Sequence, residues 1–250
     1  MVLDPIAALV AEFVGRTGAT DTAGLYDLAE YLVDESLWSN FVIYPMKSSQ
    51  NVGSGSTVEP FGGLTSNDMT LVNSPTWGTG GIAFASASSH GASVSDFLGS
   101  GNVYAFDRMA MTRTTSSAIE TVHSQYSSTD NMRSWWTRVE GTLGGNDAVL
   151  LVSSDGTAGT TVAAYGGSFW MTTDDVTYMS LFTGDGKGEF RKEATVVLPL
   201  TSITGSRYDS TANILLEGAG DPVRRAFAVV FDVTLTETQI TNMRDLINAL

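Results

Sequence analysis

The stretch Ala226-Phe227-Ala228-Val229-Val230-Phe231-Asp232-Val233 decides how the rest of the chain is interpreted. It is short, apolar and rich in β-branched and aromatic residues, which predicts a buried strand. Thr236 then precedes Gln239 by three residues, the spacing of a capping box. Beyond that cap, apolar residues recur at helical spacing: Ile240, Met243, Leu246, Ile247 and Leu250. The chain therefore closes as a core strand and a short amphipathic helix, which must dock on an apolar surface to be stable.

The composition indicates that this surface is a β-sheet. The 250 residues include 26 glycines, only 16% are charged, and 42% are apolar, which suits many short strands joined by tight turns. After a Gly/Ser-rich loop over residues 50–67, about ten candidate strands follow one another between residues 69 and 217, with turn signals such as Asp155-Gly156 between them. Residues 188–200 form one of these candidates, and none is predicted between residues 113 and 133. Because no helix separates these strands, the pattern excludes a βαβ architecture and predicts an antiparallel sandwich or barrel.

Two helices are predicted before the strands. Asp4-Pro5 starts the first, whose apolar residues fall on one face: Ile6, Leu9, Val10, Phe13 and Val14. We divide the chain into a helical docking segment, residues 1–40, and a sandwich domain, residues 41–250. Since an apolar face cannot remain in water on a short isolated helix, it must pack on the sandwich, on a second copy or on another protein. The flexible joint from Gly15 to Thr20 favours a helix that reaches outward, so we expect this face to carry assembly contacts, with a homo-oligomer as the outcome.

Two ordered sets of residues resemble concanavalin A-like, LamG-type jelly-roll domains. Thr70-Leu71-Val72-Asn73-Ser74-Pro75-Thr76-Trp77, followed by Gly81-Ile82-Ala83-Phe84, is similar to the opening of these domains. Residues 214–219, the strand described above and residues 235–240 resemble their close. The helix and Leu37-Trp38 before Tyr44-Pro45 are similar to the lead-in of such domains in tailed-bacteriophage structural proteins.

The resemblance covers residues 25–250 and implies a fold and a function. The implied fold is mainly β: an antiparallel jelly-roll β-sandwich with N-terminal helices and a short C-terminal helix. The implied function is that of a non-enzymatic structural protein on the surface of a bacteriophage virion, either a capsid decoration or cement protein or a tail or fibre component. Its partners would then be other capsid or tail proteins.

The sequence contains none of the patterns that glycan hydrolysis by this fold requires. Related glucanases place catalytic carboxylates as Glu-x-Asp-x-x-Glu on one strand, where alternation directs the first two to the same face. Glu120, Glu140, Glu189 and Glu193 each lack an Asp two residues on. His90 and His123, the only histidines, have no Gly-x-Ser-x-Gly motif to serve, and we expect both at the surface. We therefore predict no enzyme activity.

Calcium is the one metal ion that the sequence leaves open. Asp174, Asp175, Asp185 and Glu189 lie in or near predicted turns and offer oxygen ligands. They do not form an EF-hand pattern, so we predict no cofactor and keep calcium as the alternative.

The aromatic pair Trp135-Trp136 is the candidate for glycan binding. Neighbouring strand residues point to opposite faces, so one indole should fill the core and the other should lie outside, where it could stack on a sugar ring. Trp170, Tyr165 and Tyr178 belong to the same aromatic set, for which core packing is the favoured interpretation. A module that recognises a host surface polysaccharide is therefore the alternative to a purely structural virion protein.

Charge and cysteine content exclude other classes of partner. The net charge of −14 leaves no basic face for nucleic acid or for an anionic membrane surface. No apolar stretch approaches the roughly 20 residues that span a bilayer. There is no cysteine, which excludes disulfides and thiolate metal sites.

Overall fold

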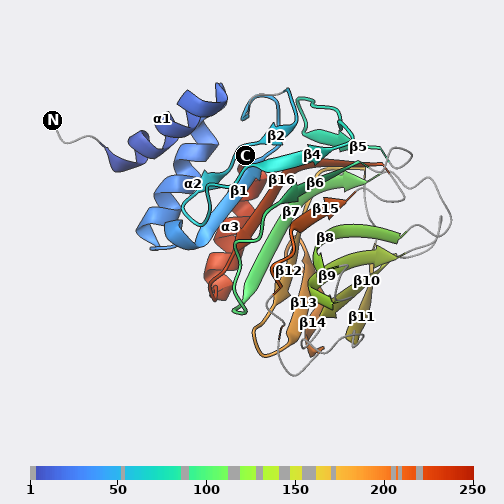
Figure 1. The fold of residues 1–250 in the computed structure, drawn as a ribbon. Helices are drawn as coiled ribbons and strands as arrows, with labels where there is room; N and C mark the ends of the chain where they lie inside the picture. Colours follow the sequence, from blue (N-terminus) through green and yellow to red (C-terminus); the bar gives the residue numbers. More distant parts are fainter. Residues whose placement is uncertain are drawn as a thin grey trace.

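A computed structural model describes most of the chain as three packed layers (Figure 1). The described residues are 4–51, 54–85, 90–111, 119–127, 132–140, 147–153, 162–169, 173–203, 207, 210–217 and 222–250. Helices form one layer, and two eight-stranded sheets form the other two. Every pairing between named strands is antiparallel. The predicted antiparallel β-sandwich with N-terminal helices and a C-terminal helix is confirmed.

The middle layer, called here the central sheet, has the strand order β14-β13-β12-β7-β16-β1-β3, with β5 paired to β16. Its strands are β1 (Phe41–Pro45), β3 (Phe61–Gly62), β5 (Ile82–Phe84), β7 (Val103–Met111), β12 (Val176–Phe182), β13 (Lys187–Lys192), β14 (Thr195–Ser202) and β16 (Val223–Phe231). The strand that opened the sequence analysis is thus β16, which lies between β7 and β1.

The other sheet, called here the outer sheet, has the order β11-β10-β9-β8-β15-β6-β4-β2. Its strands are β2 (Thr57–Val58), β4 (Met69–Val72), β6 (Gly91–Val94), β8 (Ile119–Ser127), β9 (Met132–Glu140), β10 (Asp147–Ser153), β11 (Val162–Phe169) and β15 (Ile214–Glu217). Apolar side chains from the facing sides of the two sheets form one core, which includes the fully buried Trp135.

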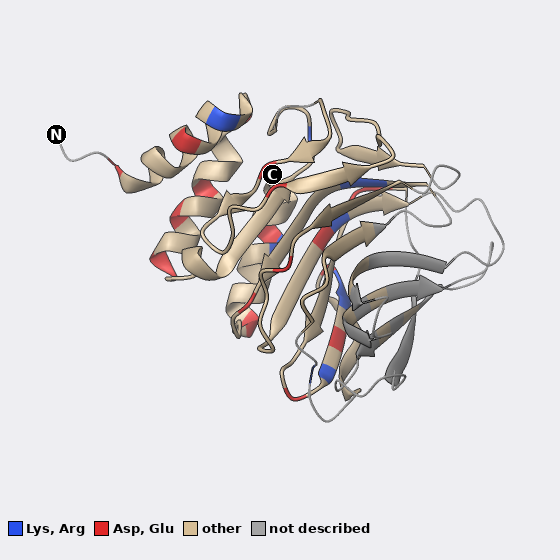
Figure 2. Cartoon of the chain, viewed as in Figure 1, with Lys and Arg blue, Asp and Glu red and all other residues tan. Residues whose placement is uncertain are grey.

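The helices create a second core on the other side of the central sheet. They are α1 (Pro5–Thr17), α2 (Ala23–Asp34), the short 3₁₀ helix η1 (Trp38–Asn40) and α3 (Glu237–Ala249). Apolar residues of all three α-helices pack with Phe41, Phe106 and Phe231 of the sheet. Acidic residues lie along the solvent sides of α1 and α2 (Figure 2). None of the described helices is long and apolar enough to cross a bilayer.

The helix ends follow the signals in the sequence. The Asp4 side chain accepts a hydrogen bond from the Ile6 amide, with Pro5 in the first turn, and Gly18 ends α1 in the left-handed conformation. Thr236 and Gln239 form the predicted capping box of α3. Met243 and Ile247 are fully buried, whereas Leu246, predicted as core, is only half-buried.

Helix α1 packs against its own chain, which corrects the expectation that it reaches outward. Ile6, Val10 and Phe13 are buried in the second core, while Leu9 and Val14 are half-buried. The Phe13 ring packs on Phe61 of β3 with 5.0 Å between centroids. An apolar face that is covered in this way no longer requires a second copy or another protein.

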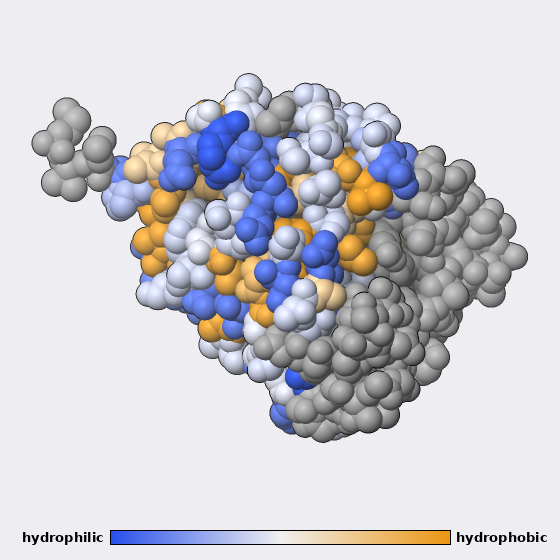
Figure 3. Space-filling model, in the orientation of Figure 1, coloured by the Kyte–Doolittle hydropathy of each residue, from blue (hydrophilic) through white to orange (hydrophobic). Residues whose placement is uncertain are grey.

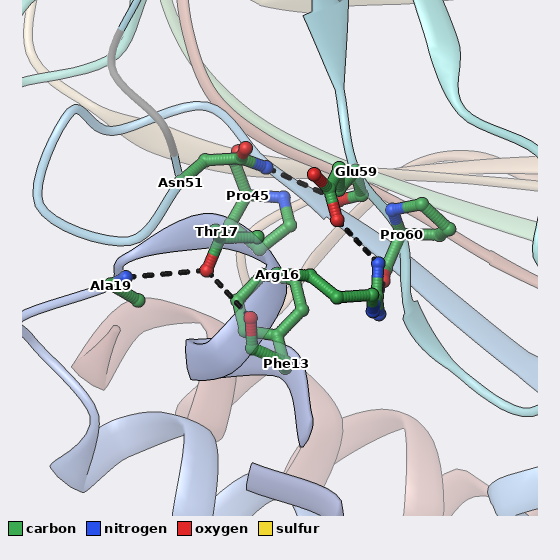
Figure 4. Close-up of polar contacts among 8 residues, drawn as sticks. All are labelled: Phe13, Arg16, Thr17, Ala19, Pro45, Asn51, Glu59 and Pro60. Carbon is green, nitrogen blue, oxygen red and sulfur yellow. Dashed lines mark hydrogen bonds and ion pairs between the residues drawn. The ribbon is translucent and has the colours of Figure 1, made fainter. Parts of the chain in front are cut away.

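Polar contacts hold the C-terminal end of α1 against the sandwich (Figure 4). Arg16 pairs with Glu59 at 2.5 Å and donates to the Pro60 carbonyl at 3.1 Å. Asn51 donates to the Pro45 and Glu59 carbonyls, so it links β1 to the segment that Arg16 contacts. The helical segment and the sandwich therefore share a core, and independent folding of residues 41–250 stays a prediction.

Several strands differ from their sequence-based prediction, each for an identifiable reason. Residues 188–200, predicted as one strand, form the hairpin β13–β14, because Glu193 adopts a φ of 50° without the usual turn glycine. The loop predicted over residues 50–67 contains the two-residue strands β2 and β3. Strand β8 was not predicted at all, since its inward positions His123 and Gln125 are polar and hide the alternation.

We expect Phe13→Ala to lower the free energy of unfolding by about 3–5 kcal/mol, because the ring is buried on Phe61. Leu9→Ala, on the same helix but half-buried, should cost clearly less. Denaturant unfolding of both variants measures the difference. Equal, small losses would show that α1 is not docked on the sandwich in solution.

Candidate functional site

A chain of polar side chains crosses the apolar interior between the two sheets. Arg225 of β16 donates to Asp107 Oδ1 of β7 at 3.0 Å, and Asp107 Oδ2 lies 2.7 Å from His123 Nδ1 of β8. His123 Nε2 lies 2.8 Å from Thr137 Oγ1 of β9, which is 2.9 Å from Ser180 Oγ of β12. Five strands from both sheets therefore meet through one hydrogen-bonded chain, called here the buried polar chain.

The neighbouring residues support this chain from the outer sheet. The Trp135 indole lies against the His123 ring with 4.8 Å between centroids and donates to Gln125 Oε1 at 3.2 Å. The Gln125 amide nitrogen donates in turn to Asp96 and to the Ser210 carbonyl, at 2.6 and 2.8 Å. The hydrogen bonds of Trp135 and Gln125 hold β9 and β8, which carry Thr137 and His123, in fixed positions.

Asp107, His123 and Thr137 stand in the acid, base and hydroxyl order of hydrolytic triads, but they have no access to substrate. All members of the buried polar chain are at most 2% exposed. The cavity beside Asp107 and His123 measures about 10 Å³, the lower limit for a single water molecule. The arrangement therefore serves to join the sheets, and it offers no room for an external substrate.

His123 corrects the prediction that both histidines lie at the surface. It is 2% exposed and directed into the sandwich, because its strand pairs with β9 so that His123 faces Thr137. Nothing in the sequence around His123 distinguished a buried polar partner from a solvated one. His90 is half-buried, and its Nδ1 accepts from the Ala85 amide at 3.0 Å.

Of the aromatic residues considered for glycan binding, two lie in the core between the sheets, and the side chains of the other three lie outside the described residues. Trp135 is fully buried, as predicted for one member of the pair, and Tyr178 stacks on Phe190 in the same core. The backbone of Trp136 pairs with Ser124 of β8 and Val152 of β10. The side chains of Trp136 and Tyr165, and all of Trp170, lie outside the described residues.

Three of the carboxylates considered for calcium, Asp175, Asp185 and Glu189, form ion pairs with basic side chains. Asp175 accepts from Arg224, Asp185 pairs with Lys187, and Glu189 pairs with Arg191, while Asp174 is exposed. Within the described ranges no group of three or more acidic or histidine side chains is placed to hold a metal ion. Calcium binding stays an untested alternative.

Comparison with known proteins identifies the fold of this chain but assigns the chain to no family. No protein-family model and no curated protein matches the chain. Among solved structures, the botulinum neurotoxin serotype D binding domain has a TM-score of 0.60 at 9% identity, covering 84% of this chain and 52% of that one. The serotype G binding domain has a TM-score of 0.61 at 10% identity, covering 83% and 51%.

A sialidase has the same fold over a similar length. Trypanosoma rangeli sialidase matches with a TM-score of 0.61 at 11% identity, covering 88% of this chain and 39% of its own. The chain thus spans about half the length of the toxin domains and less of the sialidase. These similarities confirm the jelly-roll β-sandwich, whereas identities this low establish the fold alone.

We expect Asp107→Ala to destabilise the protein by about 3–5 kcal/mol, because it removes a buried carboxylate that pairs with the guanidinium of Arg225, which is 1% exposed. Asp185→Ala is the matched control: its ion pair with Lys187 is solvent-exposed, and its loss should destabilise the protein far less than Asp107→Ala does. Chemical denaturation measures both. Similar small losses would mean that the buried polar chain does not hold the sheets together.

Proposed function

We propose that this chain is a non-enzymatic jelly-roll module that binds glycans. The observation that carries the proposal is the full burial of Trp135 in β9. Strand alternation then assigns position 136 to the opposite face of the outer sheet, away from the central sheet and the helices that cover it. An indole on that face would offer a flat apolar surface to a sugar ring.

The similar structures support the chemical class of ligand. One of these structures concerns botulinum neurotoxin type C, whose cell entry depends on interaction with two ganglioside molecules. Another is the ligand-binding domain of serotype D in complex with N-acetylneuraminic acid. Both ligands carry sugars. Because identity is 8–9% in these two cases, they suggest saccharide binding for this chain without indicating which saccharide or which residues.

Two features of the described residues favour binding over catalysis. The one triad-like arrangement is sealed inside the sandwich, and Asp175, Asp185 and Glu189 are neutralised by basic partners. The toxin structures are binding domains, yet a sialidase has the same fold. An assay of reducing-sugar release over a panel of polysaccharides, with sialosides included, should therefore give no product.

A glycan array, followed by titration of the strongest ligand, tests the binding proposal. Trp136→Ala should abolish the signal or weaken it at least tenfold, because the stacking surface is removed. Trp136→Phe should retain part of it, since a ring remains. Unchanged melting temperatures in both variants provide the folding control. Absence of binding to any glycan at millimolar concentration would refute the proposal.

A second candidate function, a structural protein of a bacteriophage virion, rests on the ordered motifs that resemble phage jelly-roll domains. The turn residues of that opening, Asn73 and Ser74, both adopt positive φ, 60° and 56°, and Ile82 and Phe84 enter the core. Glycan binding and a place on a particle surface are compatible, since a decoration, tail or fibre protein can carry a receptor-binding site.

Antibody labelling of purified particles, with mass spectrometry of the same particles, tests the virion proposal. We expect the chain at fixed positions on the capsid or tail, and its absence from purified particles would contradict a virion role. Self-association stays a prediction, which light scattering of the isolated protein decides.

A further inference from the structure

The central sheet ends in a hollow that the helices do not cover. The hollow lies where β5 pairs with the start of β16 (Figure 1) and measures about 210 Å³. Alanines account for it: Ala83 and Ala85 are exposed beside it, and Ala110 of β7 lies in the same lining. Phe84 and Val223, both buried, provide further apolar contacts.

The hollow exists because side chains on the helix-facing side of the central sheet become smaller toward the strand ends near β5. Near α3 this face carries large side chains such as Tyr104, Phe106 and Phe227, which fill the second core. Arg108 still contacts Asn248 of α3, and beyond the helices the same strands carry Ala110 and Arg224. Hydrophilic and hydrophobic residues are interspersed over the described part of the face seen in Figure 3. The hollow is therefore a local depression with an apolar lining and polar edges.

Arg224 lines the hollow and, together with its ion-pair partner Asp175, forms the pair called here the polar wall. Arg224 Nη2 donates to Asp175 Oδ1 at 2.9 Å, and the two side chains are 43% and 24% exposed. Gly80 packs against the other side of the guanidinium, where a Cβ atom would lie only 3.1–3.2 Å from three of its atoms. The guanidinium is thus held between a carboxylate and a backbone segment, with its orientation set before any ligand arrives.

The wall retains free capacity for hydrogen bonds. A guanidinium has five N–H donors, and among the described residues only Asp175 accepts from Arg224. Asp175 Oδ2 likewise keeps its acceptor sites within the described part of the chain. Donors and acceptors therefore stand side by side, next to an apolar surface of small side chains.

We propose that this hollow is a second saccharide site, separate from Trp136, and that it takes one neutral sugar ring. The inference rests on the proposed glycan-binding function. Vicinal hydroxyls match the adjacent donors and acceptors of the Arg224–Asp175 pair, and the C–H face of a ring matches the alanines. The volume of the hollow, about 210 Å³, is below the roughly 300–1,000 Å³ of pockets that bind larger ligands, which favours a single sugar ring.

Charge determines the choice of a neutral sugar over an acidic one. Asp175 already balances the Arg224 charge, so an added carboxylate would have no unpaired cation in the wall. The chain as a whole carries −14, which repels anions at long range. Binding should consequently depend little on salt concentration.

Titration of isotope-labelled protein with the methyl glycosides of glucose, galactose, mannose and N-acetylglucosamine tests the site by NMR. We expect at least one of them to shift the Ala83 and Arg224 amide signals with a millimolar Kd, and methyl glucuronide to bind more weakly. Arg224→Lys keeps the charge but loses the planar fork, and Ala83→Leu fills the hollow, so each should raise Kd at least tenfold. Ala8→Leu, at an exposed position of α1, is the size-matched control and should leave Kd unchanged.

Trp136→Ala separates this site from the proposed function. If the hollow is an independent site, shifts at Ala83 and Arg224 persist in that variant, and the shift at Ala83 is lost or strongly weakened in Arg224→Lys. Sugar binding that Trp136→Ala abolishes, with no shifts at the hollow in the wild-type protein, overturns the second site and leaves the glycan-binding function intact. Absence of any sugar binding by the wild-type protein overturns both. Matching melting temperatures confirm that the variants remain folded.

Discussion

The middle strands of the central sheet, β1, β7 and β16, are buried on both faces, and the arrangement of the other layers depends on that burial. In β1 every residue is buried, and in β16 only Arg224 is exposed. A sheet of this kind needs a partner layer on each side, because either face left in water would expose a continuous apolar surface. The outer sheet covers one face and the three helices cover the other, which explains why α1 and α3 dock although neither is long enough to be stable alone.

Within that apolar interior the buried polar chain is an exception with a structural role. Burying Asp107 and Arg225 costs several kcal/mol of desolvation for each ion, which their contact and the hydrogen bonds to His123 and beyond offset. Such a chain makes one register of the two sheets more stable than the registers shifted by one residue, because the shift would separate a buried charge from its partner. Its burial also leaves the Asp107, His123 and Thr137 side chains without access to an external substrate.

Function is consequently assigned to surfaces that the layers leave uncovered. The outer sheet has one face on the core and one away from it, and among the described residues the central sheet is uncovered at the hollow beside β5 and along most of β14. We propose one saccharide site at position 136 of the outer sheet and a second in the Arg224 hollow of the central sheet. A jelly roll that presents saccharide sites there suits attachment to a glycosylated surface, whether the protein acts alone or as part of a virion.

The sequence by itself determined the local elements whose signals lie within a few residues: the caps at Asp4 and Thr236, the apolar strand β16 and the antiparallel sandwich. It also predicted that one indole of the Trp135-Trp136 pair fills the core. Tertiary structure decided the rest, because the partners are distant in the chain. Phe13 meets Phe61, and Asp107 meets both His123 and Arg225, so the outward first helix and the surface histidine were wrong predictions. The hollow likewise depends on which strand ends the helices leave uncovered, and periodicity along the chain carries no information about that.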